Sequence, residues 1–333
     1  MPPRLAAACL GLLLLAGCTP ALRPAGPPIQ APEAMRDAFV MADGARLPYA
    51  AWLPPGPPRA IILGLHGFGD YSFNSVDIPA PLFTAAGIGV FAYDQRGFGA
   101  GRHSGIWAGG DTLAADATAV TRLVRGRYPG VPIILMGESM GVAVLLVAAT
   151  GADPPPADGY VLLAPGIRGR ATMGGFARSA LEFAAHAIPA VGFNGGAPGF
   201  VPSDNPEAMR RWSADPLTLK TFRVDLLYGL VNLMDAALAA APRFDRRALV
   251  LYGGKDVIVP ARPVRRLLRD LPETPARRLA FYPEGYHLLL RDRERAVVAR
   301  DIIAWLAAPD APLPSGADAA ATAWLAGPAE PRP

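Results

Sequence analysis

The chain has 333 residues, a formal net charge of +4 and 51% hydrophobic residues, which is enough apolar material for the core of one α/β domain of ordinary size. Its basic side chains are arginines except for Lys220 and Lys255, and no basic cluster is interleaved with aromatic residues. The composition therefore gives no indication of a nucleic-acid site. The sequence has no metal-ligand spacing and no phosphate-cradling loop, so we expect neither a metal nor a cofactor.

The N-terminus has the pattern of a bacterial lipoprotein signal. A short basic segment, Met1–Arg4, precedes a continuous apolar run from Leu5 to Ala16, which is too short to span a membrane. The run leads into Leu15-Ala16-Gly17-Cys18, which resembles a lipobox. This resemblance implies that residues 1–17 are a signal peptide and that Cys18 becomes the acylated N-terminus. The alternative is an ordinary secretory signal that happens to contain a cysteine.

Lipidation at Cys18 would place the protein in the bacterial cell envelope, because several acyl chains anchor a protein firmly to a membrane. Thr19 is not the aspartate associated with inner-membrane retention, which favours the periplasmic face of the outer membrane. Residues 18–36 are rich in Pro, Ala and Gly, and we expect them to form a flexible tether. Residues 308–333 are Ala/Pro-rich, and we expect a mobile tail there.

The region between, residues 37–307, alternates short apolar strands with helices. This alternation predicts an α/β fold with a mostly parallel, eight-stranded sheet covered by helices. The expected strands lie near residues 38–41, 47–53, 60–65, 89–93, 132–136, 160–164, 248–252 and 278–282. The expected helices lie near residues 79–86, 112–127, 140–149, 261–270 and 293–307. Active sites in such sheets lie at the carboxyl ends of the strands.

Residues 167–242 interrupt the alternation, because they contain several helical runs and no strand-like run. This segment falls between the sixth and seventh strands and predicts a helical cap. Its last helix, expected at residues 219–240, has two apolar faces at helical spacing. We expect the face with Leu226, Leu230 and Leu233 to line an acyl tunnel, and the other face to pack on the core domain. Packing against other cap helices is the alternative for the first face.

The sequence Gly137-Glu138-Ser139-Met140-Gly141 follows an apolar strand and precedes an apolar helix. A Gly-x-Ser-x-Gly in this context is typical of the nucleophile elbow of an α/β-hydrolase, a turn so tight that its serine takes a strained backbone conformation. The glycines leave room for the neighbouring strand and helix to approach. We therefore expect Ser139 to be the nucleophile.

A serine hydroxyl needs a base, and this fold places an acid and then a histidine after the serine. Asp256 follows the seventh expected strand, and His287 follows the eighth. We expect His287 to act as general base and then acid, and Asp256 to orient its ring. Glu284 and Asp292 are rival acids. Each is so close to His287 in sequence that we expect it beside the loop rather than behind the ring.

The third expected strand ends in His66-Gly67-Phe68-Gly69-Asp70. Histidine–glycine loops at this place supply one backbone N–H to an oxyanion hole, and the residue after the nucleophile supplies the other. This predicts the amides of Phe68 and Met140 as the two donors. His66 precedes the nucleophile in sequence, so we expect it to shape the loop by hydrogen bonding. His186 lies in an apolar helical stretch, and we expect a structural role for it.

Together these motifs resemble the monoacylglycerol lipase, lysophospholipase and serine aminopeptidase branch of the α/β-hydrolases. Two positions depart from the branch: Val142 stands where it usually has glycine, and Asp70-Tyr71 stands where it often has Glu-His. The matching pieces, which span residues 38 to about 307, are His66–Gly69, Tyr93–Gly99, Gly137–Gly141, Asp215–Leu217, Gly254–Asp256 and Gly285–His287.

The resemblance implies a serine hydrolase that cleaves carboxylic esters of fatty or other apolar acids through an acyl-Ser139 intermediate. Lysophospholipid or monoacylglycerol is the expected substrate, reached from a membrane to which the chain is anchored. An acyltransferase would use the same triad with an alcohol in place of water. Peptidase or amidase activity is a weaker enzyme alternative, and the intact triad argues against a non-catalytic binding module.

Overall fold

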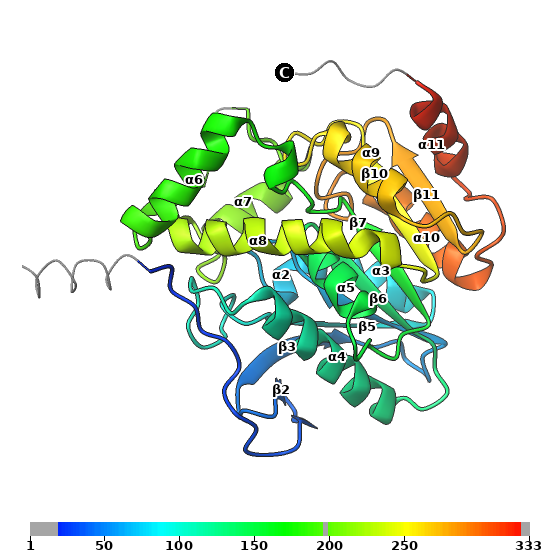
Figure 1. Cartoon of the computed structure of the whole chain (residues 1–333). Helices are drawn as coiled ribbons and strands as arrows, with labels where there is room; N and C mark the ends of the chain where they lie inside the picture. The colour runs from blue at the N-terminus through cyan, green and yellow to red at the C-terminus, as the bar shows by residue number, and fades with distance from the viewer. Residues whose placement is uncertain (1–18, 196–198, 328–333) are drawn as a thin grey trace, which may run out of the picture.

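The structure is a computed structural model that describes residues 19–195 and 199–327. Its main sheet has nine strands in the order β1-β2-β3-β5-β4-β6-β7-β10-β11 (Figure 1). From β5 to β11 all neighbouring strands are parallel, and β3 is antiparallel to β5. The nine strands are β1 (Glu33–Ala34), β2 (Ala38–Val40), β3 (Arg46–Trp52), β4 (Ala60–Leu65), β5 (Ile88–Tyr93), β6 (Ile133–Glu138), β7 (Gly159–Leu163), β10 (Ala248–Gly253) and β11 (Arg277–Tyr282).

This architecture confirms the expected α/β-hydrolase fold with a mostly parallel sheet. All eight expected strands are present, and the two-residue strand β1, paired with β2, adds a ninth. Strand alternation divides the core into two layers, as β4 illustrates: Ile61 and Leu63 contribute to one cluster of buried side chains, and Ile62 contributes to the other.

Helices cover both faces of the sheet. The side chains of α2 (Ser72–Val76), α3 (Ala80–Ala85) and α10 (Arg295–Ala307) join the cluster that contains Ile62. Those of α4 (Gly110–Arg127), α5 (Met140–Thr150) and α9 (Ala261–Asp270) join the other cluster. The apolar residues of each helix therefore face a sheet that is covered on both sides, which explains why the parallel strands are almost continuously hydrophobic.

The segment between β7 and β10 lies above the carboxyl ends of the strands and carries the elements of the expected cap. The structure differs from the expectation at two points. The segment contains a short antiparallel strand pair, β8–β9, and α8 begins at Val224 because residues 221–223 pair with residues 192–194 instead of extending the helix. The elements are a 3₁₀ turn (Arg170–Thr172), α6 (Gly175–Ala187), β8 (Gly192–Asn194), α7 (Pro206–Ala214), β9 (Thr221–Arg223), α8 (Val224–Ala240) and a second 3₁₀ turn (Ala241–Arg243).

Helix α8 crosses the molecule between α6 and the α/β core (Figure 1). Among the described residues, Val224–Arg243 is long and apolar enough to cross a membrane by composition alone. Much of that apolar surface is buried against the core, where Leu226, Leu233 and Ala237 are almost inaccessible to solvent. Gly229 permits the close approach, because a Cβ at this position would lie 2.3 Å from the Trp107 ring. The apolar composition of α8 is therefore explained by packing inside the domain.

The N-terminal segment runs along the domain, in contrast to the expected free tether. The Ala21 amide donates to the Asp225 carboxylate at 3.1 Å, and the Arg23 amide donates to the Trp107 carbonyl at 2.8 Å. Further along, the Gly26 amide donates to the Asp43 carboxylate at 2.9 Å. Pro, Ala and Gly have little side chain to bury, but their backbone groups can still pair with fixed acceptors on the domain. The expected signal peptide, residues 1–17, and Cys18 lie outside the described residues.

The C-terminal segment is also more ordered than expected, because α11 (Ala317–Ala326) packs against the edge strand β11. The Trp324 ring stacks on Phe281 with centroids 4.9 Å apart, and the Arg265 guanidinium lies 4.3 Å from the centre of the indole. Arg278 on β11 forms an ion pair with Asp318 at 2.8 Å. The helix thus covers one end of the sheet, where an exposed strand edge invites pairing with another chain.

We expect Trp324→Ala to lower the free energy of unfolding by about 2–4 kcal/mol, since it removes a large, partly buried aromatic contact. Urea denaturation of the full chain measures this change. Leu325→Ala is the matched control: its side chain is exposed, so a change within about 0.5 kcal/mol is expected. Equal effects of the two substitutions would show that α11 contributes no specific docking.

Candidate active site

Ser139 occupies the turn between β6 and α5 and has a backbone φ of +53°, in the region that strongly favours glycine. Its amide donates to the Leu163 carbonyl, and its carbonyl accepts from the Gly166 amide, both at 3.0 Å. These bonds hold the strained residue from the side of β7. A strained serine retained by its surroundings is an observation that points toward function.

Three glycines make this turn possible. A Cβ at Gly137 would lie 2.6 Å from the carbonyl carbon of Gly141, and a Cβ at Gly141 would lie 2.2 Å from the Leu65 carbonyl oxygen. The third is Gly166, where a Cβ would lie 2.6 Å from the Ser139 carbonyl carbon. The Gly-x-Ser-x-Gly motif predicts the roles of Gly137 and Gly141. The role of Gly166 is evident only from the structure, which places the loop after β7 beside the elbow.

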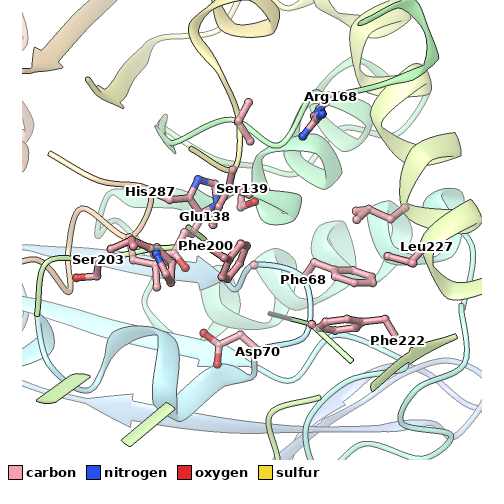
Figure 2. Close-up of a pocket in the computed structure, with 18 of the residues that line it drawn as sticks. Phe68, Asp70, Glu138, Ser139, Arg168, Phe200, Ser203, Phe222, Leu227 and His287 are labelled. Atoms are coloured by element: carbon pink, nitrogen blue, oxygen red, sulfur yellow. The ribbon is translucent and has the colours of Figure 1, made fainter. Parts of the chain in front are cut away.

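His287 and Asp256 form a buried pair beside Ser139. The Nδ1 atom of His287 lies 2.7 Å from the Asp256 carboxylate, and both residues are almost inaccessible to solvent. The other carboxylate oxygen accepts the amides of Ile258 and Val259, each at 2.9 Å. These bonds fix the carboxylate behind the ring. Because Nδ1 is occupied, the geometry leaves Nε2 to face the serine (Figure 2).

The structure places the two rival acids elsewhere. Glu284 is exposed and forms an ion pair with Lys255 at 2.5 Å. Asp292 accepts the Ser203 hydroxyl at 2.6 Å and the Tyr286 amide at 2.8 Å, so it braces the loop that carries His287. The sequence suggests three carboxylates as the partner of His287, and of these three only Asp256 contacts the imidazole.

The loop after β4 lies against the elbow, since a Cβ at Gly67 would be 3.5 Å from the Ser139 Cβ. Met140 is the first residue of α5, so its amide has no acceptor within the helix. Phe68 lines the same cavity as Ser139, and within the described chain its amide has no hydrogen-bond acceptor. The structure thus brings both expected oxyanion donors to the side of the serine.

His66 shapes this loop and is not placed to act as a base. Its Nδ1 donates to the Gly67 carbonyl at 2.8 Å, while its Nε2 accepts the Gln95 amide at 3.0 Å. Burial lowers the pKa of His66, so the ring is neutral and this tautomer is retained. His186 lies on α6 with its Nδ1 2.8 Å from the Glu182 carbonyl, away from the serine.

A buried ion cluster beneath the site was not anticipated from the sequence. The Arg291 guanidinium contacts the carboxylates of Asp70 and Glu138, the second at 3.3 Å. All three side chains are buried. Burial raises the pKa of Glu138, and the neighbouring Arg291 opposes that rise. The sequence contains one indication of this cluster. Each of the three residues lies within four positions of an expected site residue, and the charge of Arg291 is opposite to that of Asp70 and Glu138.

Ser139 and His287 both open into one cavity of ≈ 990 Å³ beneath the cap (Figure 2). This volume is in the range of pockets for small organic ligands. Most of the wall is apolar, with contributions from the oxyanion loop, β9 and α8. The apolar side chains on this wall include Phe68, Phe222, Leu227, Leu230, Val231 and Met234.

The cavity corrects the expected acyl-contacting face of α8. Leu230 lines the cavity as expected, but Leu226 and Leu233 do not, because they are buried against the core. The lining residues Leu227, Val231 and Met234 come from the face that was expected to pack on the core domain. The physical reason is Gly229, which lets that side of α8 approach Trp107 and turns the opposite stripe toward the cavity.

Among the residues that the structure describes, no group of three or more His, Cys, Asp or Glu side chains is arranged to hold a metal ion.

Sequence comparisons connect this arrangement to known proteins. The chain is 26% identical over 274 residues to a monoacylglycerol lipase of Mycolicibacterium smegmatis, which covers 80% of this chain and 95% of that protein. It is 27% identical over 277 residues to the monoglyceride lipase of Rattus norvegicus, covering 80% and 89% of the two chains.

Solved structures show the same fold. A soluble variant of monoglyceride lipase from Saccharomyces cerevisiae, in complex with a substrate analog, matches with a TM-score of 0.68 and 21% identity over 84% of this chain and 94% of that one. The monoacylglycerol lipase of Paleococcus ferrophilus matches with a TM-score of 0.64 and 23% identity, over 78% and 98%. Residues 56–294 match the family model of the serine aminopeptidases, S33, and this chain therefore belongs to that family of α/β-hydrolases.

Proposed function

We propose that the chain hydrolyses carboxylic esters of fatty acids, with monoacylglycerol or a lysophospholipid as substrate, through an acyl-Ser139 intermediate. The observation that carries the proposal is the strained Ser139 beside the buried His287–Asp256 pair, at the wall of a largely apolar cavity. Family membership and the relatives named as monoacylglycerol lipases support ester hydrolysis as the reaction class.

In the proposed first half-reaction, the Ser139 hydroxyl attacks the ester carbonyl carbon while His287 Nε2 takes its proton. Asp256, held by two backbone amides, keeps the ring oriented and stabilises the imidazolium. The amides of Phe68 and Met140 donate to the oxyanion of the tetrahedral intermediate. The intermediate collapses by expelling the alcohol, which receives the proton from His287.

In the second half-reaction, His287 takes a proton from water as the water oxygen attacks the acyl-serine carbonyl. A second tetrahedral intermediate forms at the same oxyanion donors. Its collapse releases the fatty acid and returns the proton to the Ser139 oxygen. The apolar wall of α8 holds the acyl chain during both steps, and each buried methylene contributes about 0.8 kcal/mol at most.

The triad predicts a defined pattern of losses. Ser139→Ala should abolish labelling by a fluorophosphonate probe and nearly all esterase activity. Asp256→Asn should lower kcat by roughly 10³–10⁴, because the amide NH₂ would donate to Nδ1 of His287 and hold the ring in the wrong tautomer. Hydrolysis of p-nitrophenyl esters measures both. Glu284→Gln is the matched control and should keep near-wild-type turnover. The acid assignment is wrong if Glu284→Gln removes activity while Asp256→Asn retains it.

The two faces of α8 should respond differently to the same substitution. Leu227→Ala removes side-chain surface from the cavity wall, so kcat/KM for dodecanoate esters should fall several-fold more than kcat/KM for acetate esters. Leu226→Ala removes a fully buried side chain and should instead lower the free energy of unfolding by about 2–5 kcal/mol, with no dependence on acyl length.

Kinetics across a series of acyl lengths, together with thermal unfolding of each variant, separate these effects. An equal loss for long and short esters in Leu227→Ala, at unchanged thermal stability, would show that α8 is not the acyl wall.

We infer that the chain is a lipoprotein of the bacterial cell envelope, attached through Cys18 at the periplasmic face of the outer membrane. The lipobox-like sequence supports this, and so does the path of the following residues. The Ala21 amide, three residues after Cys18 in sequence, donates to Asp225 at the start of α8. The exposed Phe176 and Phe183 on α6 are further apolar side chains on the cap.

Cys18→Ser should prevent incorporation of a palmitate analogue in growing bacterial cells and release the protein from the membrane fraction. Cys18 precedes the expected α/β domain, residues 37–307, so hydrolysis of soluble esters by the variant should persist. Unchanged labelling in Cys18→Ser would exclude lipidation at this cysteine and favour an ordinary secretory signal.

A further inference from the structure

Arg168 is a cationic side chain on the wall of the cavity into which Ser139 opens (Figure 2). It lies in the segment between β7 and the first 3₁₀ turn and is exposed to the cavity. Its neighbours fix the backbone on both sides. Ile167 is fully buried, and a Cβ at Gly169 would lie 2.3 Å from the Asp235 carboxylate. The guanidinium is therefore presented from a well-packed segment.

The acidic side chains around Arg168 are already paired with other cations. Arg170 contacts Asp235 at 2.6 Å and Glu182 at 2.7 Å. The two carboxylates that line the cavity, Asp70 and Glu138, contact the buried Arg291.

Arg210, the other arginine on the cavity wall, pairs with Glu207 at 3.4 Å. Within the described chain, Arg168 thus has no acidic partner.

We propose that Arg168 binds an anionic phosphate group on the alcohol part of the ester substrate. This inference rests on the proposed ester hydrolysis and adds the substrate class. The apolar wall formed by α8 suits an acyl chain, which leaves the polar part of a monoacyl ester to meet the guanidinium. A planar guanidinium matches the oxygens of a phosphate in a bidentate geometry. Partial enclosure in the cavity reduces the screening that weakens such pairs at an open surface.

The test compares two substrates with the same acyl chain, 1-lauroylglycerol and 1-lauroylglycerol 3-phosphate. The full chain is used in a non-ionic detergent. Arg168→Gln should lower the ratio of kcat/KM for the phosphate ester to kcat/KM for the neutral ester about tenfold, and Arg168→Lys should retain part of that ratio. Raising the salt concentration should reduce the difference between wild type and Arg168→Gln. Arg210→Gln, the matched control, should leave the ratio unchanged.

Binding of glycerol 3-phosphate, measured by the shift in thermal unfolding of the Ser139→Ala variant, tests the site without turnover. A shift that disappears on adding Arg168→Gln supports the proposal even if neither lauroyl ester is hydrolysed, in which case only the proposed function fails. The phosphate-binding proposal is overturned if Arg168→Gln loses activity equally on both substrates. It is also overturned if Arg210→Gln changes the ratio as much as Arg168→Gln does. Equally strong binding of inorganic phosphate would assign the site to a free anion and overturn the head-group assignment.

Discussion

The buried guanidinium of Arg291 joins the three loops on which the site depends. Asp70 belongs to the loop after β4, Glu138 is the last residue of β6, and Arg291 follows the histidine loop after β11. Taking three charges out of water is costly, and mutual attraction offsets that cost only when the partners are held in good geometry. Removing Arg291 would leave the Asp70 and Glu138 carboxylates buried without a cation. The oxyanion loop, the elbow and the histidine loop are therefore coupled through one side chain.

The strain at Ser139 depends on the same packing. A non-glycine residue at φ +53° persists only when its surroundings determine its position, and here β4, α5 and the loop after β7 all approach the turn. A Cβ added at Gly141 would collide with the backbone of Leu65, and one added at Gly166 would collide with the backbone of Ser139. Packing in the core thus stabilises the strained conformation of Ser139. The cap forms the part of the cavity wall that faces the serine.

The fold and the three proposed triad residues could be predicted because their signals are local or ordered along the chain. Apolar strands, the glycine-flanked serine, and an aspartate and histidine each placed after a strand can be read without knowing any contact. The apolar faces of α8 could not be assigned in this way. Both faces have helical spacing, and only the contact of Gly229 with Trp107 decides which one meets the core. The partners of Arg291 could not be assigned either, because they are 153 and 221 residues away in sequence.

The two terminal segments show a further limit of composition. Both are poor in large side chains, and both are ordered by partners elsewhere in the fold: Asp225, Trp107 and Asp43 accept the N-terminal amides, while Phe281 and Arg265 hold Trp324. Asp225, itself held by Arg223, lies in the first turn of α8, two residues before the cavity-lining Leu227. In the lipoprotein proposed above, the anchored segment would be attached to the helix that forms the apolar wall, so membrane attachment and the acyl-binding surface would share one structural element.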